Sequence, residues 1–280
     1  MMFITFGLLN KWNSTNKYNS KIRRTKNIRQ LFKKCFKSKH LFCLSLFLKR
    51  IIQVILRKNT MKSSLDFLKA LKTNNDRDWF NANKNWFLQS SEEFKSFINQ
   101  LIAGVNEFDN FVGPMDPKDC IFRIYRDVRF SHDKAPFKTN FGAYIAKGGR
   151  KSPYAGYYFH LDAESSFASG GIYMAPTDVM KRIREDIDLY PEEFLSIVDD
   201  KKFKETFQFF EEEKLKRVPQ GFDKDSPVVE YLKFKHITPY HSLSEKDIAD
   251  KNLLKNTLNV FEAMKPLVDF LNRSIRGLNE

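Results

Sequence analysis

Apolar residues recur at steps of three and four between positions 64 and 105, which is the spacing of one helical face. Ser64 is expected to cap a short helix over Leu65–Leu71, and Asp76 to cap a longer one. The apolar face of the longer helix continues to Val105, and we expect a break in it near Ser90. Aromatic residues at this spacing are typical of a packed core rather than of a base-stacking surface.

Beyond a Gly-Pro break, the apolar residues alternate with polar ones, which predicts strands. Four such segments follow one another along the chain: Ile121–Phe130, Phe141–Ala146, Ala155–Asp162 and Ser166–Tyr173. Because the loops between them are short, we expect an antiparallel meander. In the third segment Tyr157, Phe159 and Leu161 form one face, and Tyr158 and His160 form the other.

Helical spacing returns in the C-terminal third of the chain. The expected helices are Thr177–Asp188, Glu192–Val198, one capped by Asp199 or Asp200, Pro227–Leu232, and a last helical region after a capping box of Ser244 and Asp247. Lys233–His241 alternates like a strand, and Pro239 places that strand at a sheet edge. The expected fold is α+β: an antiparallel β-meander flanked by N-terminal and C-terminal helices, as a single domain over residues 61–280.

The net charge of +14 comes from the first sixty residues. This extension holds ten lysines, five arginines and no acidic residue, which leaves 33 basic and 34 acidic residues in the rest of the chain. The body of the protein is therefore near neutral, and its charge does not favour a nucleic-acid partner for residues 61–280.

Three interpretations of residues 1–60 remain open: an organelle-targeting segment, a basic arm for nucleic acid or anionic lipid, or sequence ahead of the true start at Met61. Their low-complexity composition favours the third. The apolar run Leu41–Leu56 is shorter than the ~20 residues that span a bilayer, so no transmembrane segment is expected. Cys35 and Cys43 lie in this extension, so Cys120 is the one cysteine in residues 61–280, which fits a reducing cytosol. The targeting interpretation would imply an organellar location instead.

The charged residues that stand out lie between positions 123 and 138. This stretch contains three arginines, two lysines and two aspartates, so basic groups exceed acidic groups by three. Arginine stays charged in proteins and pairs through two N–H groups with carboxylate or phosphate oxygens. An anionic ligand can neutralise the excess, or the arginines and aspartates can form a purely structural network.

The same stretch resembles the signature of the Domain of Unknown Function 2461 family. In that signature Arg-x-x-Arg-Asp-x-Arg-Phe is followed by Asp or Asn, then Lys, and three residues later by Tyr; this chain has Phe137 at the last position. The segments Asn74–Phe80, Tyr231–Lys235 and Phe270–Asn272 agree with the resemblance, which runs from about Ser64 to Leu278. It implies a bacterial-type domain, found also in some fungal chains, and leaves the chemistry open. A family mechanism that used the tyrosine hydroxyl would not be available here.

The leading hypothesis is a basic pocket on the sheet that binds a small anionic or phosphate-bearing ligand. Its candidate ligand-binding residues are Arg123, Arg126, Asp127, Arg129, Asp133 and Lys134. If the domain is an enzyme, the arginines would stabilise developing negative charge, and an aspartate, His236 or His241 would move protons. The alternative is a non-enzymatic binding or scaffold domain in which the cluster is structural. No motif indicates a metal, a cofactor or a particular reaction.

Overall fold

The computed structural model describes residues 61–277. The expectations for residues 1–60, including the apolar run and two of the three cysteines, lie outside the described residues.

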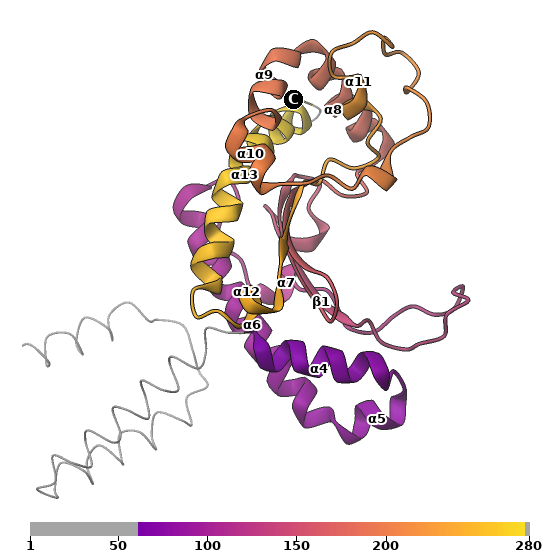
Figure 1. The fold of residues 1–280 in the computed structure, drawn as a ribbon, viewed down its shortest axis with the longest axis vertical. Helices are drawn as coiled ribbons and strands as arrows, with labels where there is room; N and C mark the ends of the chain where they lie inside the picture. Colours follow the sequence, from indigo (N-terminus) through magenta and orange to yellow (C-terminus); the bar gives the residue numbers. More distant parts are fainter. Residues whose placement is uncertain (1–60, 278–280) are drawn as a thin grey trace, which may run out of the picture. The chain divides into compact units, whose positions relative to one another are not determined.

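The N-terminal part of the described chain is helical, as predicted (Figure 1). Its helices are α4 (Lys62–Thr73), α5 (Arg77–Ala82), α6 (Lys84–Phe108) and the short α7 (Pro117–Cys120). Asp76 caps α5 by accepting a hydrogen bond from the Trp79 amide, which confirms that prediction.

Two details of the helix prediction were wrong. Ser64 lies inside α4, where its buried hydroxyl donates a 3.1 Å hydrogen bond to the Ser90 carbonyl of α6. The break falls at Asn83, between α5 and α6, and not near Ser90. Both serines serve the contact between two helices, and a contact of this kind does not appear in the local pattern of either helix.

Four strands form one antiparallel sheet in the order β1-β2-β3-β4, which confirms the α+β class and the meander. The strands are β1 (Asn140–Ile145), β2 (Gly156–Asp162), β3 (Ser166–Gly171) and β4 (Tyr240–Leu243). β4 is an edge strand as expected, but it begins only after Pro239. The predicted strand Ile121–Phe130 was wrong: only Ile121 and Tyr125 make isolated bridges, to Ala143 and Phe137.

Helices dominate the C-terminal part: α8 (Thr177–Leu189), α9 (Pro191–Val198), α10 (Lys201–Thr206), α11 (Val229–Leu232), α12 (Glu245–Ala249) and α13 (Leu253–Arg276). Asp200 caps α10, and Ser244 with Asp247 forms the predicted capping box. α11 begins two residues later than expected. Within residues 61–277, no helix has both the length and the apolar character needed to cross a membrane.

One face of the sheet is buried against α6 and α13, which lie on the same side of it in Figure 1. Tyr157, Phe159 and Leu161 point into this core, as their alternation predicted. The Phe159 ring lies 4.9 Å from that of Phe97 in α6, and the Tyr157 ring lies 5.2 Å from that of Phe261 in α13. Burying each such side chain contributes about 1.5–3 kcal/mol, so this face is the main source of stability for the sheet.

A buried amide fastens α13 to the start of β2. The side chain of Asn272 accepts a 2.9 Å hydrogen bond from the Ala155 amide and donates a 3.1 Å bond to the Ala155 carbonyl. Asn272 is 1 % exposed, so water cannot replace its side chain as the hydrogen-bond partner of the Ala155 N–H and C=O groups. One side chain thus satisfies both backbone groups of a buried residue.

The opposite face, which we call the outer face, carries Tyr158, His160 and Phe167, all half-buried. The Tyr158 hydroxyl lies 2.9 Å from His160 Nδ1, and the His160 ring stacks on Phe167 at 4.6 Å. A Cβ atom on Gly142 of β1 would collide with that hydroxyl, so glycine leaves the space that the phenol occupies. Desolvation by burial lowers the pKa of His160 from 6.5 to about 4, so its ring is neutral at pH 7.

Replacing Asn272 with alanine is expected to destabilise the protein by about 2–4 kcal/mol, because the N–H and C=O groups of Ala155 would stay buried without partners. Urea denaturation of the full chain measures this change. Asn259→Ala provides the matched control, because Asn259 is exposed on the same helix, and it should change the free energy of unfolding by less than about 0.5 kcal/mol. Equal effects of the two substitutions would show that the Asn272 amide is not a structural fastener.

The depressed pKa of His160 makes stability depend on pH in a defined direction. Between pH 6.5 and about 4 the unfolded chain binds a proton at this ring that the folded chain does not, so the free energy of unfolding falls as the pH falls through this window. His160→Gln, which cannot titrate, should show a smaller fall than the parent chain. An NMR titration that placed the His160 pKa at or above 6.5 would contradict the burial of this ring.

Candidate functional site

Residues 121–139, which we call the arm, form a two-legged excursion between α7 and β1 that extends away from the sheet (Figure 1). Its legs pair with each other: the Arg126 amide donates to the Pro136 carbonyl at 3.0 Å, and the Lys138 amide to the Ile124 carbonyl at 2.7 Å. Beyond these bonds, the charged tip has no neighbouring strand to complete a ladder. This explains why an alternating pattern did not produce a strand of the sheet.

Two arginines of the arm are matched by its two aspartates. Arg126 pairs with Asp133, and Arg129 binds both carboxylate oxygens of Asp127 at 2.9 and 2.6 Å. The hydrogen bonds from Arg129 lower the pKa of Asp127, and the Ala135 amide followed by Arg126 lowers that of Asp133. Both aspartates therefore remain ionised at neutral pH.

Three basic groups of the arm lack such partners. Lys134 donates to the Val128 carbonyl at 3.1 Å. Among residues 61–277, no carboxylate lies within 4.0 Å of the charged groups of Arg123, Lys134 or Lys138. The excess of three positive charges counted in the sequence is thus not cancelled inside the arm by ion pairs.

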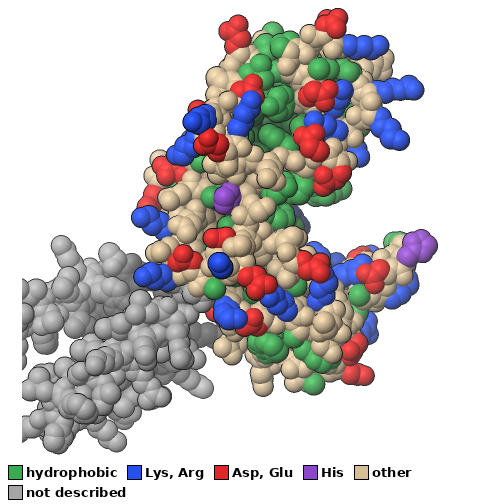
Figure 2. Space-filling view, in the orientation of Figure 1, with side chains coloured by type: hydrophobic (Ala, Val, Ile, Leu, Met, Phe, Trp, Pro, Cys, Tyr) green, Lys and Arg blue, Asp and Glu red, His purple; other side chains and the backbone are tan. Residues whose placement is uncertain are grey.

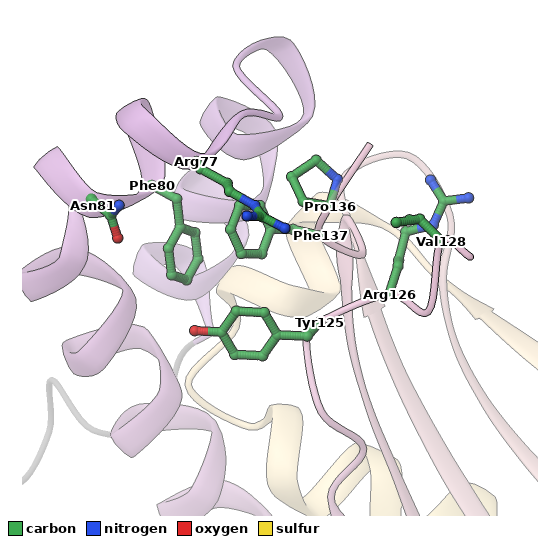
Figure 3. A pocket seen from close by; sticks show the side chains of 8 residues that line it. All are labelled: Arg77, Phe80, Asn81, Tyr125, Arg126, Val128, Pro136 and Phe137. Atoms are coloured by element: carbon green, nitrogen blue, oxygen red, sulfur yellow. The ribbon is translucent and has the colours of Figure 1, made fainter. Parts of the chain in front are cut away.

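The inner side of the arm and helix α5 enclose a hollow of about 200 Å³, which we call the arm hollow (Figure 3). Its lining residues are Arg77, Phe80, Asn81, Tyr125, Arg126, Val128, Pro136 and Phe137. The Phe80 and Phe137 rings stack at 4.0 Å, and the Tyr125 ring lies 5.4 Å from that of Phe137. The hollow therefore combines aromatic walls with two arginine side chains.

The arm hollow contains only one of the six residues predicted as ligand-binding, namely Arg126. The other five, Arg123, Asp127, Arg129, Asp133 and Lys134, belong to the arm but do not line the hollow. Sequence analysis gave no role to Arg77 or Tyr125. The signal that was available is the basic and aromatic character of α5, but no local pattern shows that α5 meets a segment about fifty residues away.

Phe137, where the family signature has tyrosine, is 3 % exposed and packs against Phe80. The phenol at the hollow comes instead from Tyr125, whose hydroxyl lies 3.5 Å from Lys84 Nζ. The side chains that line the hollow can thus offer guanidinium N–H groups, a phenol and an amide. This set suits recognition of a carboxylate or phosphate group.

The two histidines considered as acid and base are held by backbone groups elsewhere. His236 Nδ1 accepts a 3.0 Å hydrogen bond from the Met174 amide, and His241 Nδ1 lies 2.9 Å from the Thr206 carbonyl. Neither histidine lines the arm hollow. In the described part of the chain, no group of three His, Cys, Asp or Glu side chains is arranged to hold a metal ion.

Comparison with protein-family models gives a match. A family model described as "Conserved hypothetical protein (DUF2461)" matches residues 63–270, which include all the strands, the arm and the arm hollow. No curated protein and no solved structure matches the chain. The match covers well over half of the 280 residues, and the chain belongs to the DUF2461 family.

Proposed function

We propose that this protein binds a small anionic ligand, with a carboxylate or phosphate group, in the arm hollow. The observation that carries the proposal is that Arg77 and Arg126, from separate segments, line one hollow with three aromatic side chains. Guanidinium groups bind planar or tetrahedral oxyanions, and the walls of Phe80, Phe137 and Tyr125 fit an apolar or aromatic body attached to the anion.

Each of the six residues predicted from the sequence has a place in this proposal. Arg126 contacts the ligand through the N–H groups that its neighbours do not engage. Asp133 binds one amino group of the guanidinium, and the other amino group lies 3.5 Å from Ser131 Oγ. The Asp127–Arg129 pair stabilises the tip of the arm. Arg123 and Lys134 add positive charge that attracts an anion to this side of the molecule.

A second candidate is a non-enzymatic binding or scaffold domain in which the arginines and aspartates are architecture. The matching of two arginines by two aspartates favours it. This candidate predicts that no small anion stabilises the protein beyond the effect of ionic strength.

The charge of residues 61–280 and the state of Cys120 bear on the ligand class and the cellular compartment. The near-neutral charge of residues 61–280 argues against nucleic acid as their ligand. Cys120 is a buried free thiol, which fits a reducing, cytosolic environment.

Benzoate and phenyl phosphate are suitable probes, because each joins an anionic group to an aromatic ring. At one hundred times its dissociation constant, a bound ligand adds about 2.7 kcal/mol of stability, which raises the Tm of a domain of this size by about 5–10 °C. Thermal unfolding of the full chain at constant ionic strength measures the shift.

Arg126→Met and Arg77→Met should each remove most of the benzoate shift. Arg129→Met should retain it, because that guanidinium is already bound by Asp127. Arg217→Met removes an exposed arginine outside the arm and serves as the control for net charge. A parent chain that sodium chloride stabilises as much as benzoate does would refute the proposal and favour the scaffold candidate.

A further inference from the structure

A second group of basic side chains lies where the arm joins the sheet. Lys138 is half-buried just before β1, and its Nζ atom lies 5.7 Å from the centre of the Phe122 ring. Burial, and then the nearby Arg123 guanidinium, lower the pKa of Lys138. Two cations are thus held close together, although neither has a carboxylate within 4.0 Å in the described chain. Such an arrangement costs free energy unless an anion occupies it.

The outer face of the sheet continues from these cations. The Phe122 ring meets Tyr158 edge-on at 6.3 Å, and Tyr158 is bonded to His160. Lys138 is also close enough to His160 for its charge to contribute to the lowered pKa of that ring. Lys138, Arg123, Tyr158 and His160 therefore border one region, although they come from both legs of the arm and from β2.

Two acidic residues close to this region are engaged elsewhere: Asp127, whose pKa the Arg123 charge helps to lower, is bound by Arg129, and Asp162 is bound in a turn. Asp162 Oδ1 accepts hydrogen bonds from the amides of Glu164 and Ser165 at 2.8 and 3.3 Å, and Oδ2 accepts one from the Thr139 hydroxyl at 3.4 Å. These bonds hold the β2–β3 turn. The charge of Asp162 acts against burial by raising the His160 pKa, but Asp162 does not form an ion pair with Lys138.

The Tyr158–His160 pair has one hydrogen-bond donor more than its mutual bond uses. A neutral imidazole carries one N–H and a phenol carries one O–H, and the 2.9 Å contact consumes one of the two. If the phenol donates to Nδ1, the Nε2–H group remains; if Nδ1 donates, the phenol O–H remains. Either tautomer leaves one donor without a partner among the described residues, beside the two cations.

We propose that Lys138, Arg123 and the Tyr158–His160 pair form a phosphate-binding site at the junction of the arm and the outer face, separate from the arm hollow. The charge selects the ligand class: a phosphate monoester carries about −1.5 to −2 at pH 7 and three acceptor oxygens, which match two cations and one neutral donor. A monocarboxylate would neutralise only one of the cations. Phe122 and Phe167 flank the site and fit the carbon skeleton of the ester.

The test uses the full chain with inorganic phosphate and phenyl phosphate, measured by calorimetry and by amide NMR shifts. Lys138→Met and Arg123→Met should each weaken phosphate binding at least tenfold. Tyr158→Phe should weaken it several-fold, because the substitution removes the free phenol O–H donor if His160 carries its proton at Nδ1. If the proton is at Nε2, the substitution removes the hydrogen bond that fixes the His160 ring. Lys151→Met, which removes an exposed lysine elsewhere, should leave the affinity unchanged. The largest amide shifts should occur at Thr139, Gly142 and Tyr158.

Comparing the Arg77 and Lys138 variants distinguishes binding at this site from binding in the arm hollow. Loss of phosphate binding in Arg77→Met with full retention in Lys138→Met would overturn the site proposed here while supporting the hollow. Loss in Lys138→Met with an unchanged benzoate shift would support the second site independently of the hollow. A parent chain that binds no phosphate, or shows shifts only around α5, would also overturn it.

Discussion

The burial of a single face of the sheet is the constraint on which the rest of the structure depends. Side chains alternate across a strand, so packing Tyr157, Phe159 and Leu161 against α6 and α13 sends Tyr158 and His160 to the other side. A shift of one residue in register would exchange the two sets and place a histidine in the core. The hydrophobic free energy of one face therefore fixes which polar groups the other face presents, and the cations of the arm lie beside those groups.

Charge pairing divides the arm into two parts with different behaviour. Two aspartates can match only two of its five basic side chains, and they match Arg126 and Arg129 near the tip. These pairs are largely exposed, and exposed ion pairs contribute little to stability. Their main effect is to orient guanidinium groups. Arg123 and Lys138, at the base, have no carboxylate within 4.0 Å in the described chain, and burial followed by the Arg123 charge lowers the pKa of Lys138.

Sequence patterns predicted correctly the elements that depend on neighbouring residues. They did not predict contacts that depend on a residue far away in the chain. The cap at Asp76, the capping box at Ser244 and the two faces of β2 depend on residues within a few positions of one another, and the structure confirms each. Ser64 is of a residue type that commonly caps helices, but its hydroxyl binds the Ser90 carbonyl of α6 instead. Apolar and polar residues do alternate after Ile121, but a strand of the sheet also needs a neighbouring strand to hydrogen-bond with. The arm extends beyond β1, so only isolated bridges form. Arg77 and Tyr125 meet only through the fold, so no spacing rule could have joined them.

Ordering the arm costs conformational entropy, and the contacts that the arm makes with the rest of the protein are few. Holding residues 125–136 in a two-legged excursion loses conformational entropy, and the aromatic contacts that offset this loss are confined to the base, where Phe137 and Tyr125 meet Phe80. Phe130 at the tip is 96 % exposed and recovers almost nothing. A shorter loop from Ile124 to Phe137 would keep these contacts and omit the charged tip. Under the proposed function, an anion bound between the arm and α5 by Arg77 and Arg126 would offset part of the free energy that the arm loses by being ordered.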